Sequence, residues 1–300
     1  MRLTLGPVLY NWPVDEWRDF YARIADEAAV DTVVVGETVC AKRLPFFEAL
    51  LPEIIERLQS AGKDVVLATL GLIMTEKERE VAAQHAATEG VMIEANDISV
   101  VAALAGRSFH VGPMMNVYNE GPLAFLAGRG AARVTLPPEL PASSVSVLAG
   151  AGAAEIEVQA FGRVPLAISA RCYHARARNL HKDGCQYVCA EDPDGMTVET
   201  LDGEPFLAVN GVQTMSLSYL NLAAEVESLA AMGVSGLRLS PQHMDMVSVS
   251  QVFRDLLDGR LSIDEADGKI AALSGDVPFS NGFFHGREGR AFTADSLQAE

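Results

Sequence analysis

Short apolar stretches alternate with amphipathic stretches along most of this chain. The apolar stretches are rich in β-branched residues, which is typical of strands buried on both faces. Between them, apolar side chains recur at helical spacing, as at Trp17, Tyr21 and Ile24. We therefore predict eight strands, most of them followed by a helix, over residues 3–5, 32–35, 64–70, 91–94, 109–112, 133–136, 155–159 and 236–239.

Residues suited to begin a helix stand in front of several amphipathic stretches. A Ser or Thr followed three residues later by Glu can form a capping box, in which both side chains bond to backbone N–H groups of the first turn. Asp at the same position caps a helix by itself. Pro52 lies inside an apolar stripe, so the helix there is kinked or begins later than the stripe. The predicted caps are Thr75, Asp97, Ser143 or Ser144, and Ser262.

Eight strands alternating with helices predict an α/β fold of the (β/α)8 class, a TIM-like barrel. In such a barrel, functional side chains gather just past the carboxyl ends of the strands. An open, doubly wound sheet is the main alternative. No G-x-G-x-x-G follows an early strand, so a dinucleotide-binding fold has little support. We expect residues 1–300 to form a single barrel domain.

One long segment interrupts the alternation of strands and helices. It follows the seventh predicted strand and covers residues 160–232, which is far longer than an ordinary connection in a barrel. This segment contains Cys172, Cys185 and Cys189. Long segments with chemistry of their own usually carry function. We therefore predict a cysteine-bearing insertion between the seventh and eighth strands.

The charge balance excludes some classes of partner. The chain has 23 basic and 40 acidic residues, for a formal net charge of −17. A protein this acidic does not bind nucleic acid or an anionic membrane through bulk electrostatics. The sequence begins without the apolar core of a signal peptide, and no stretch is long and apolar enough to be a transmembrane segment. We expect a cytoplasmic protein, whose cysteines stay reduced.

The four cysteines are candidates for one metal centre. Three follow the spacing C-x12-C-x3-C, at Cys172, Cys185 and Cys189, and Cys40 lies just past the second predicted strand. A barrel brings positions past different strands to one face, so Cys40 can reach the insertion. Four thiolates suit zinc or an iron–sulfur cluster, and the spacing leaves inert core cysteines open as well. Basic residues within 171–182 could lower thiolate pKa values, hold an anionic substrate, or form only a solvated loop.

Polar side chains just past the strand ends are candidates for the substrate site. Glu37 lies just past one predicted apolar strand and Glu94 ends another, and carboxylates at such positions face the barrel mouth. Asn116 is a third catalytic candidate, although asparagine at this position can also serve only to satisfy turn backbone. Asp97 is more simply explained as a helix cap. The wider set of pocket candidates comprises Thr69, Asp97, Asn119, Gln159 and Gln213.

Several runs of residues resemble a known family. The run P-L-A-I-S-A-R-C at 165–172 resembles the signature region of the collagenase-like peptidase family. Four more runs point to a branch of that family which acts in oxygen-independent ubiquinone biosynthesis. The resemblance covers nearly the whole chain, but the sequence beyond Asn281-Gly282-Phe283-Phe284 departs from it. The four runs are L-G-P-V-L-Y-N-W-P (5–13), G-E-T-V-C-A-K-R (36–43), N-G-V-Q-T-M-S (210–216) and R-L-S-P-Q (238–242).

The resemblance implies a cofactor, partners and an activity. Members of the branch carry one 4Fe–4S cluster on four cysteines, and all four positions are filled here, by Cys40, Cys172, Cys185 and Cys189. They work as a heterodimer with the paralogue UbiU, and the pair hydroxylates the aromatic ring of prenylated ubiquinone precursors without molecular oxygen. A sterol-carrier-like lipid-binding protein, UbiT, accompanies them. Because four protein thiolates leave no open iron site, we expect the cluster to transfer electrons.

Three other functions stay open at this point. A peptidase is one, although the sequence has neither G-x-S-x-G nor H-E-x-x-H. Cys40 or Cys172 could act as a thiol nucleophile, yet no histidine is placed beside Cys40. A cluster-bearing scaffold or redox sensor is the second. A barrel whose insertion is merely folded by zinc is the third.

Overall fold

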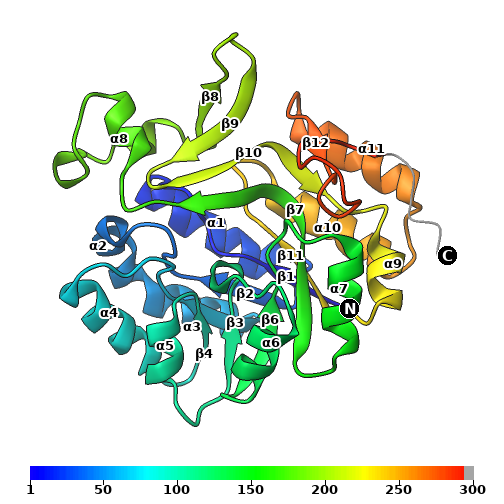
Figure 1. Cartoon of the computed structure of the whole chain (residues 1–300), viewed down its shortest axis with the longest axis horizontal. Helices are drawn as coiled ribbons and strands as arrows, with labels where there is room; N and C mark the ends of the chain where they lie inside the picture. The colour runs from blue at the N-terminus through cyan, green and yellow to red at the C-terminus, as the bar shows by residue number, and fades with distance from the viewer. Residues whose placement is uncertain (294–300) are drawn as a thin grey trace.

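Eight parallel strands close into a barrel in the computed structural model, which describes residues 1–293 (Figure 1). The last barrel strand, β11, pairs with β1 on one side and with β7 on the other, and Leu237 aligns with both Leu3 and Val158. This double pairing closes the ring and confirms the predicted TIM-like fold. The barrel strands are β1 (Arg2–Leu5), β2 (Thr32–Val35), β3 (Asp64–Ala68), β4 (Met92–Ala95), β5 (Phe109–Val111), β6 (Ala131–Thr135), the first part of β7 (Glu155–Ile168) and β11 (Gly236–Leu239).

Helices cover the outside of the barrel. The first helix buries Trp17, Tyr21 and Ile24, the stripe that the spacing predicts, and so forms part of the apolar layer between helices and strands. The helices around the barrel are α1 (Val14–Glu27), α2 (Leu44–Phe47), α3 (Leu51–Ser60), α4 (Glu76–Ala86), α5 (Ile98–Ala103), α6 (Glu120–Ala127), α7 (Ala142–Gly150), α9 (Val226–Ala231), α10 (Met246–Leu257) and α11 (Ile263–Ser274). Short 3-10 turns η1 (Ala41–Arg43), η2 (Glu48–Leu50) and η3 (Pro113–Met115) lie between them.

Most of the predicted helix starts are confirmed. Thr75 and Ser262 form capping boxes, and Asp97 accepts a hydrogen bond from the backbone N–H of Ser99. The helix that contains Pro52 begins late, with this proline in its first turn. The prediction that Ser143 or Ser144 caps α7 is wrong: the cap position is Pro141, whose extended ψ turns the chain into the helix without a side-chain hydrogen bond.

The seventh strand is longer than predicted and leaves the barrel. Its first half pairs with β6 and β11, whereas its second half pairs antiparallel with β10 (Gln213–Asn221). Gly162 lies at the change of direction with φ of +98°, and a Cβ there would lie 2.5 Å from the carbonyl oxygen of Ser240. Gly162 and Pro165 suggest the end of a strand in the sequence, but in the structure they bend and continue one.

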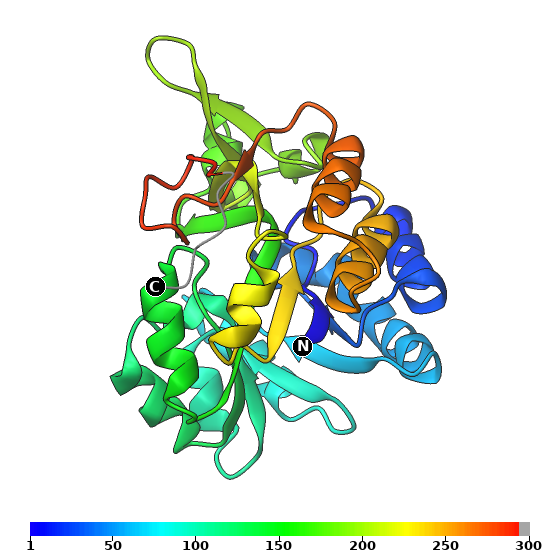
Figure 2. The ribbon, with the colours of Figure 1, turned by 90° about the vertical axis from the view of Figure 1, so that its right-hand side faces the viewer.

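The segment after β7 extends the same sheet beyond the barrel, mostly with antiparallel strands. β10 pairs with β9 (Pro205–Asn210), β9 pairs with β8 (Met196–Glu199), and β12 (Phe279–Ser280) joins β10. The β8–β9 hairpin projects away from the barrel in both views (Figures 1 and 2). The three insertion cysteines lie before this hairpin, around α8 (Tyr173–Ala177), η4 (Lys182–Gly184) and η5 (Val188–Glu191). Among residues 1–293, no helix is both long and apolar enough to cross a membrane.

Candidate metal centre

The four cysteines line one cavity. Cys40 reaches it from the loop after β2, and Cys172, Cys185 and Cys189 reach it from the segment around α8, η4 and η5. Cys172 and Cys189 are buried, Cys40 and Cys185 are half-buried, and all four are free thiols. The structure therefore brings together thiols that are more than 130 residues apart in the sequence. The other lining residues are Lys42, Arg43, Lys182, Tyr187, Val188 and Gly211.

Glu37 fixes the loop that carries Cys40. Its carboxylate accepts hydrogen bonds from the backbone N–H groups of Val39, at 2.7 Å, and Cys40, at 3.0 Å. The side chain is buried, and its burial raises its pKa although Arg43 opposes this. Glu37 therefore turns toward its own loop and positions the first cysteine, which is a different task from the barrel-mouth chemistry that the sequence suggests.

The insertion cysteines are held by backbone and side-chain N–H groups. Cys172 occupies the cap position of α8, where its Sγ accepts a hydrogen bond of 3.4 Å from the backbone N–H of Ala175. The Sγ of Cys189 accepts one of 3.4 Å from Nδ2 of Asn11, which belongs to the loop after β1. Between Cys185 and Cys189, Gln186 and Tyr187 both adopt left-handed backbone conformations, which non-glycine residues rarely do.

Burial favours the protonated form of two of the free thiols. It raises the pKa of Cys40, against the opposing effect of Arg43, and it raises the pKa of Cys172, against the N–H of Ala175. Metal binding to such a site releases protons, because thiolates are the ligands. Within residues 1–293, no group of three or more His, Cys, Asp or Glu side chains is arranged to hold a metal ion. The thiols instead lie around the cavity wall.

A second polar cluster fills the inside of the barrel. Arg238 of β11 forms ion pairs with Glu94 of β4 and with Glu157 of β7, the latter with a distance of 2.8 Å from Nε to Oε2. Glu157 also accepts hydrogen bonds from the hydroxyls of Thr4, at 2.6 Å, and Thr135, at 2.8 Å. Burial alone would raise the pKa of Glu157, but Arg238 and its other partners lower it to about 2.

The sequence prediction missed most of this cluster. It identified Glu94, but Glu157 and Arg238 lie inside runs that we assigned only as buried strands. The available signal was a charged residue in the middle of a predicted strand, Glu157 in E-I-E-V-Q and Arg238 in G-L-R-L. A side chain at such a position points either outward or into the barrel, and a charge buried there requires a partner of opposite sign.

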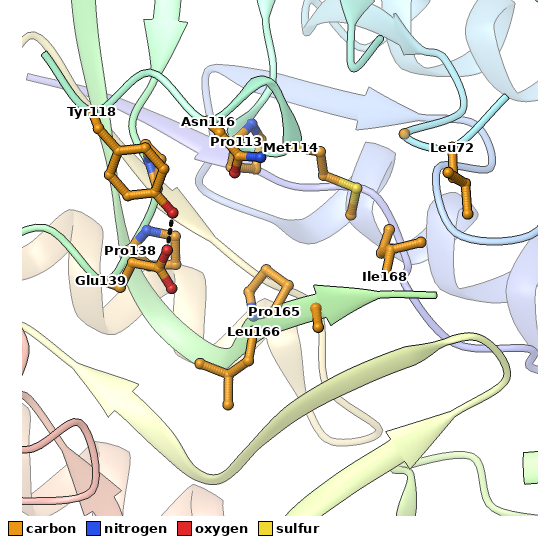
Figure 3. A pocket seen from close by; sticks show the side chains of 13 residues that line it. Leu72, Pro113, Met114, Asn116, Tyr118, Pro138, Glu139, Pro165, Leu166 and Ile168 are labelled. Atoms are coloured by element: carbon orange, nitrogen blue, oxygen red, sulfur yellow. Dashed lines mark hydrogen bonds between the residues drawn. The ribbon is translucent and has the colours of Figure 1, made fainter. Parts of the chain in front are cut away.

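The barrel mouth contains a groove of about 290 Å³. Figure 3 shows Pro113, Met114 and Asn116 on one side of it and Pro165 and Leu166 of β7 on the other. Asn116 thus lines the groove, where it adopts a left-handed conformation after η3.

A smaller cavity adjoins the groove deeper in the barrel, and Pro113, Met114 and Pro165 line both. Glu94 lies in its wall, together with the hydroxyl-bearing residues Thr38 and Ser240. The hydroxyls of Thr38 and Ser240 are buried and have no hydrogen-bond partner within residues 1–293.

The wider candidates are engaged in local structure. Thr69 and Gln213 donate hydrogen bonds to the carbonyl oxygens of Glu94 and Leu9, respectively. Gln159 donates to three carbonyl oxygens in the bend of β7. Asp97 and Asn119 cap α5 and α6. These contacts give each of the five side chains a local structural role, and Gln159 also lines the smaller cavity beside Glu94.

Comparison with known proteins identifies the family. The model of peptidase family U32 matches residues 16–293. The solved structure of dihydropteroate synthase (FolP) from Thermus thermophilus is similar with 14% identity, covering 86% of this chain and 92% of that chain, and a TM-score of 0.45. The U32 peptidase Mk0906 is similar with 14% identity, covering 81% and 93%, and a TM-score of 0.44. The match over most of the chain confirms the predicted family, and the chain belongs to peptidase family U32.

Proposed function

We propose that this chain is the iron–sulfur subunit of an oxygen-independent hydroxylase that acts on the aromatic ring of ubiquinone precursors. Its partner in this reaction is the paralogue UbiU, and its sequence runs resemble those of UbiV. The observation that carries the proposal is the cavity where Cys40 meets Cys172, Cys185 and Cys189. Four cysteines from two distant segments, in a fold with no disulfide between them, favour a shared ligand.

The cavity suits one 4Fe–4S cluster. The four thiolates would hold it, one on each of its four irons, so the ligands surround the cluster and need not converge on one point. Asn11 and the backbone N–H of Ala175 already donate hydrogen bonds to sulfur, and Lys42 and Lys182 add positive charge at the cavity wall. When bound, the cluster supplies one-electron transfer.

The barrel mouth is the proposed substrate site. The groove between Met114 and Pro165 offers apolar walls to an aromatic ring, and the hydroxyls of Thr38 and Ser240 in the adjoining cavity can bond to a polar ring substituent. Leu166 lines both this groove and a second cavity of about 590 Å³. Its apolar lining suits the prenyl chain that UbiT would deliver. The apolar side chains there are Leu166, Phe206, Leu207, Leu217 and Phe283.

Anaerobic purification tests the proposal. We expect about four iron and four sulfide per chain and the broad visible absorbance of a 4Fe–4S cluster, alone or with UbiU co-expressed. Cys40→Ser should lose iron while far-ultraviolet circular dichroism shows an intact barrel. Ala41→Ser, in η1, is the matched control because it adds a hydroxyl to the same loop, next to Cys40, and keeps all four thiols.

Three results would contradict this function. Zinc in place of iron would indicate a structural metal site. Full hydroxylation by UbiU together with the cluster-free Cys40→Ser protein would indicate a scaffold. Hydrolysis of gelatin by the cluster-free chain, abolished by Cys172→Ser, would indicate a peptidase. A thiol peptidase needs a histidine base, and the one next to Cys172 in sequence, His174, is buried with Nε2 at 2.9 Å from the carboxylate of Asp192.

A further inference from the structure

A fully buried arginine stands beside the four cysteines. Arg43 belongs to η1, three residues after Cys40, and its guanidinium lines the cysteine cavity with only 1% of the residue exposed. Nη1 donates a hydrogen bond of 3.0 Å to the carbonyl oxygen of Leu9, and Nη2 donates one of 2.6 Å to Oδ1 of Asn210. The Nε–H group is also buried, and among residues 1–293 it has no hydrogen-bond partner.

The charge of Arg43 is incompletely balanced by carboxylates. It pairs with Glu37 at 4.0 Å, and that carboxylate already accepts two backbone N–H groups. Burial alone would lower the pKa of Arg43, but the Glu37 carboxylate opposes this, and so does negative charge on Cys189 and Cys40 when they are thiolates, so that the pKa is raised. A buried cation needs compensating negative charge, and the groups that face it here are thiols that become anionic when they bind a metal.

The fold makes room for this arginine at a specific position. Gly211, which also lines the cavity, has φ of +70°, and a Cβ on it would lie 2.4 Å from Nη2 of Arg43. Asn210, the preceding residue, supplies both of its oxygens to the same nitrogen. The turn between β9 and β10 is therefore shaped around the guanidinium, which locks its position relative to the thiols.

We propose that Arg43 is a positioning residue that compensates the negative charge of the cluster and thereby raises its reduction potential. This inference rests on the proposed function. A cluster held by four thiolates is anionic and gains one more negative charge when it takes up an electron from an external reductant. A cation buried beside it stabilises the reduced state more than the oxidised state, because the Coulomb energy grows with the charge of the cluster.

A redox titration of the anaerobic protein, purified with UbiU, tests the role. Dithionite supplies the electrons, and electron paramagnetic resonance follows the reduced cluster. We expect Arg43→Gln to lower the ratio of reduced to oxidised cluster at least tenfold at a fixed potential, equivalent to a fall of about 59 mV for one electron. Arg43→Lys keeps the charge and should stay within about threefold of the unmodified protein. Arg163→Gln removes another buried arginine, paired with Asp194, and should leave the ratio unchanged.

The outcomes separate this inference from the proposed function. Absence of iron from the unmodified chain would contradict both the proposed function and this inference. A cluster-loaded Arg43→Gln protein with an unchanged potential would overturn only the role of Arg43. If Arg43→Gln fails to retain its cluster, Arg43→Lys decides the question. A cluster retained by Arg43→Lys supports charge compensation. Equal cluster loss from Arg43→Lys, with intact circular dichroism, would show that the hydrogen bonds to Leu9 and Asn210 matter instead of the charge, and would overturn the inference.

Discussion

Two buried arginines of this molecule differ in how their charges are paired. Arg238, inside the barrel, forms ion pairs with both Glu94 and Glu157, so its charge is more than matched by neighbouring carboxylates. Arg43, beside the cysteines, has Glu37 at 4.0 Å and, in the described part of the chain, an unpaired Nε. A buried charge with a closed set of partners indicates structure. One with an open side indicates where an anionic group is expected to bind.

The two surroundings also differ in what holds them together. The Arg238 cluster is built from β1, β4, β6, β7 and β11, so closure of the barrel assembles it. The Arg43 surroundings combine the loops after β1 and β2 with the turn that precedes β10. We therefore expect changes at Arg238 to affect unfolding of the whole chain and changes at Arg43 to affect mainly the cysteine centre.

The largest expected effect is the loss of Arg238. Arg238→Met leaves Glu94 buried without its cation and leaves Glu157 with only Arg133, at 3.6 Å. Removing one partner of a buried ion pair typically destabilises a protein by about 3–5 kcal/mol. Urea unfolding of the cluster-free chain measures this cost. Arg43→Met in the same cluster-free background should cost less, because only the Glu37 carboxylate is left behind. An equal loss of unfolding free energy for the two substitutions would contradict the distinction between a fully paired and a partly paired buried arginine.

Acid should weaken the barrel through Glu157. Its pKa of about 2 in the folded chain lies below the ordinary value of about 4.3 in an unfolded chain, so the pairing stabilises the fold above pH 4.3. This contribution, roughly 3 kcal/mol from the difference in pKa, is lost as the pH falls from about 4.3 to 2. Urea unfolding from pH 7 to 2 measures it. Glu157→Gln should flatten the curve in this window, and an unchanged slope would contradict the role of Glu157.

The strands were predictable because each is a short apolar run that burial requires. The same rule did not reveal the charged cluster inside the barrel. Glu157 and Arg238 lie within predicted strands and do not change where those strands begin or end. Only pairing across strands that are far apart in sequence explains why these charges are tolerated. The bend in β7 was hidden for a related reason: a glycine such as Gly162 is typical of a turn, whereas in the structure it pairs with Leu220 of β10 and the strand continues.

Part of the cysteine centre was visible in the sequence and part was not. The barrel prediction placed Cys40 at the face where the insertion begins, and the structure has all four cysteines at one cavity. The direction of Glu37 depends on two backbone N–H groups in its own loop, which no spacing reveals. Arg43 lies in the run 36–43, but nothing in that run indicates its role, because its burial depends on Asn210 and Gly211 of a distant turn.

Gly211→Ala tests the Arg43 surroundings through the backbone. We expect a loss of roughly 1–3 kcal/mol from the left-handed φ, and a weakened hold on the cluster because the new Cβ displaces Nη2 of Arg43. Gly203→Ala is the matched control, since Gly203 has a similar φ of +86° in the β8–β9 turn and open space around it. Urea unfolding and iron content measure both variants. Equal iron retention would show that the cavity tolerates movement of the guanidinium.

The smallest expected effect distinguishes the influence of a hydrogen-bond donor on the reduction potential from that of a full charge. Asn11→Leu removes the Nδ2 hydrogen bond to Sγ of Cys189, and hydrogen bonds to cluster sulfurs raise the reduction potential. The ratio of reduced to oxidised cluster should fall at a fixed potential, but by less than it does in Arg43→Gln. Gln213→Leu is the control, because it removes an amide donor to Leu9 in the same loop and none to sulfur. A shift in Asn11→Leu as large as that in Arg43→Gln would mean that N–H donors, rather than the buried charge, govern the centre.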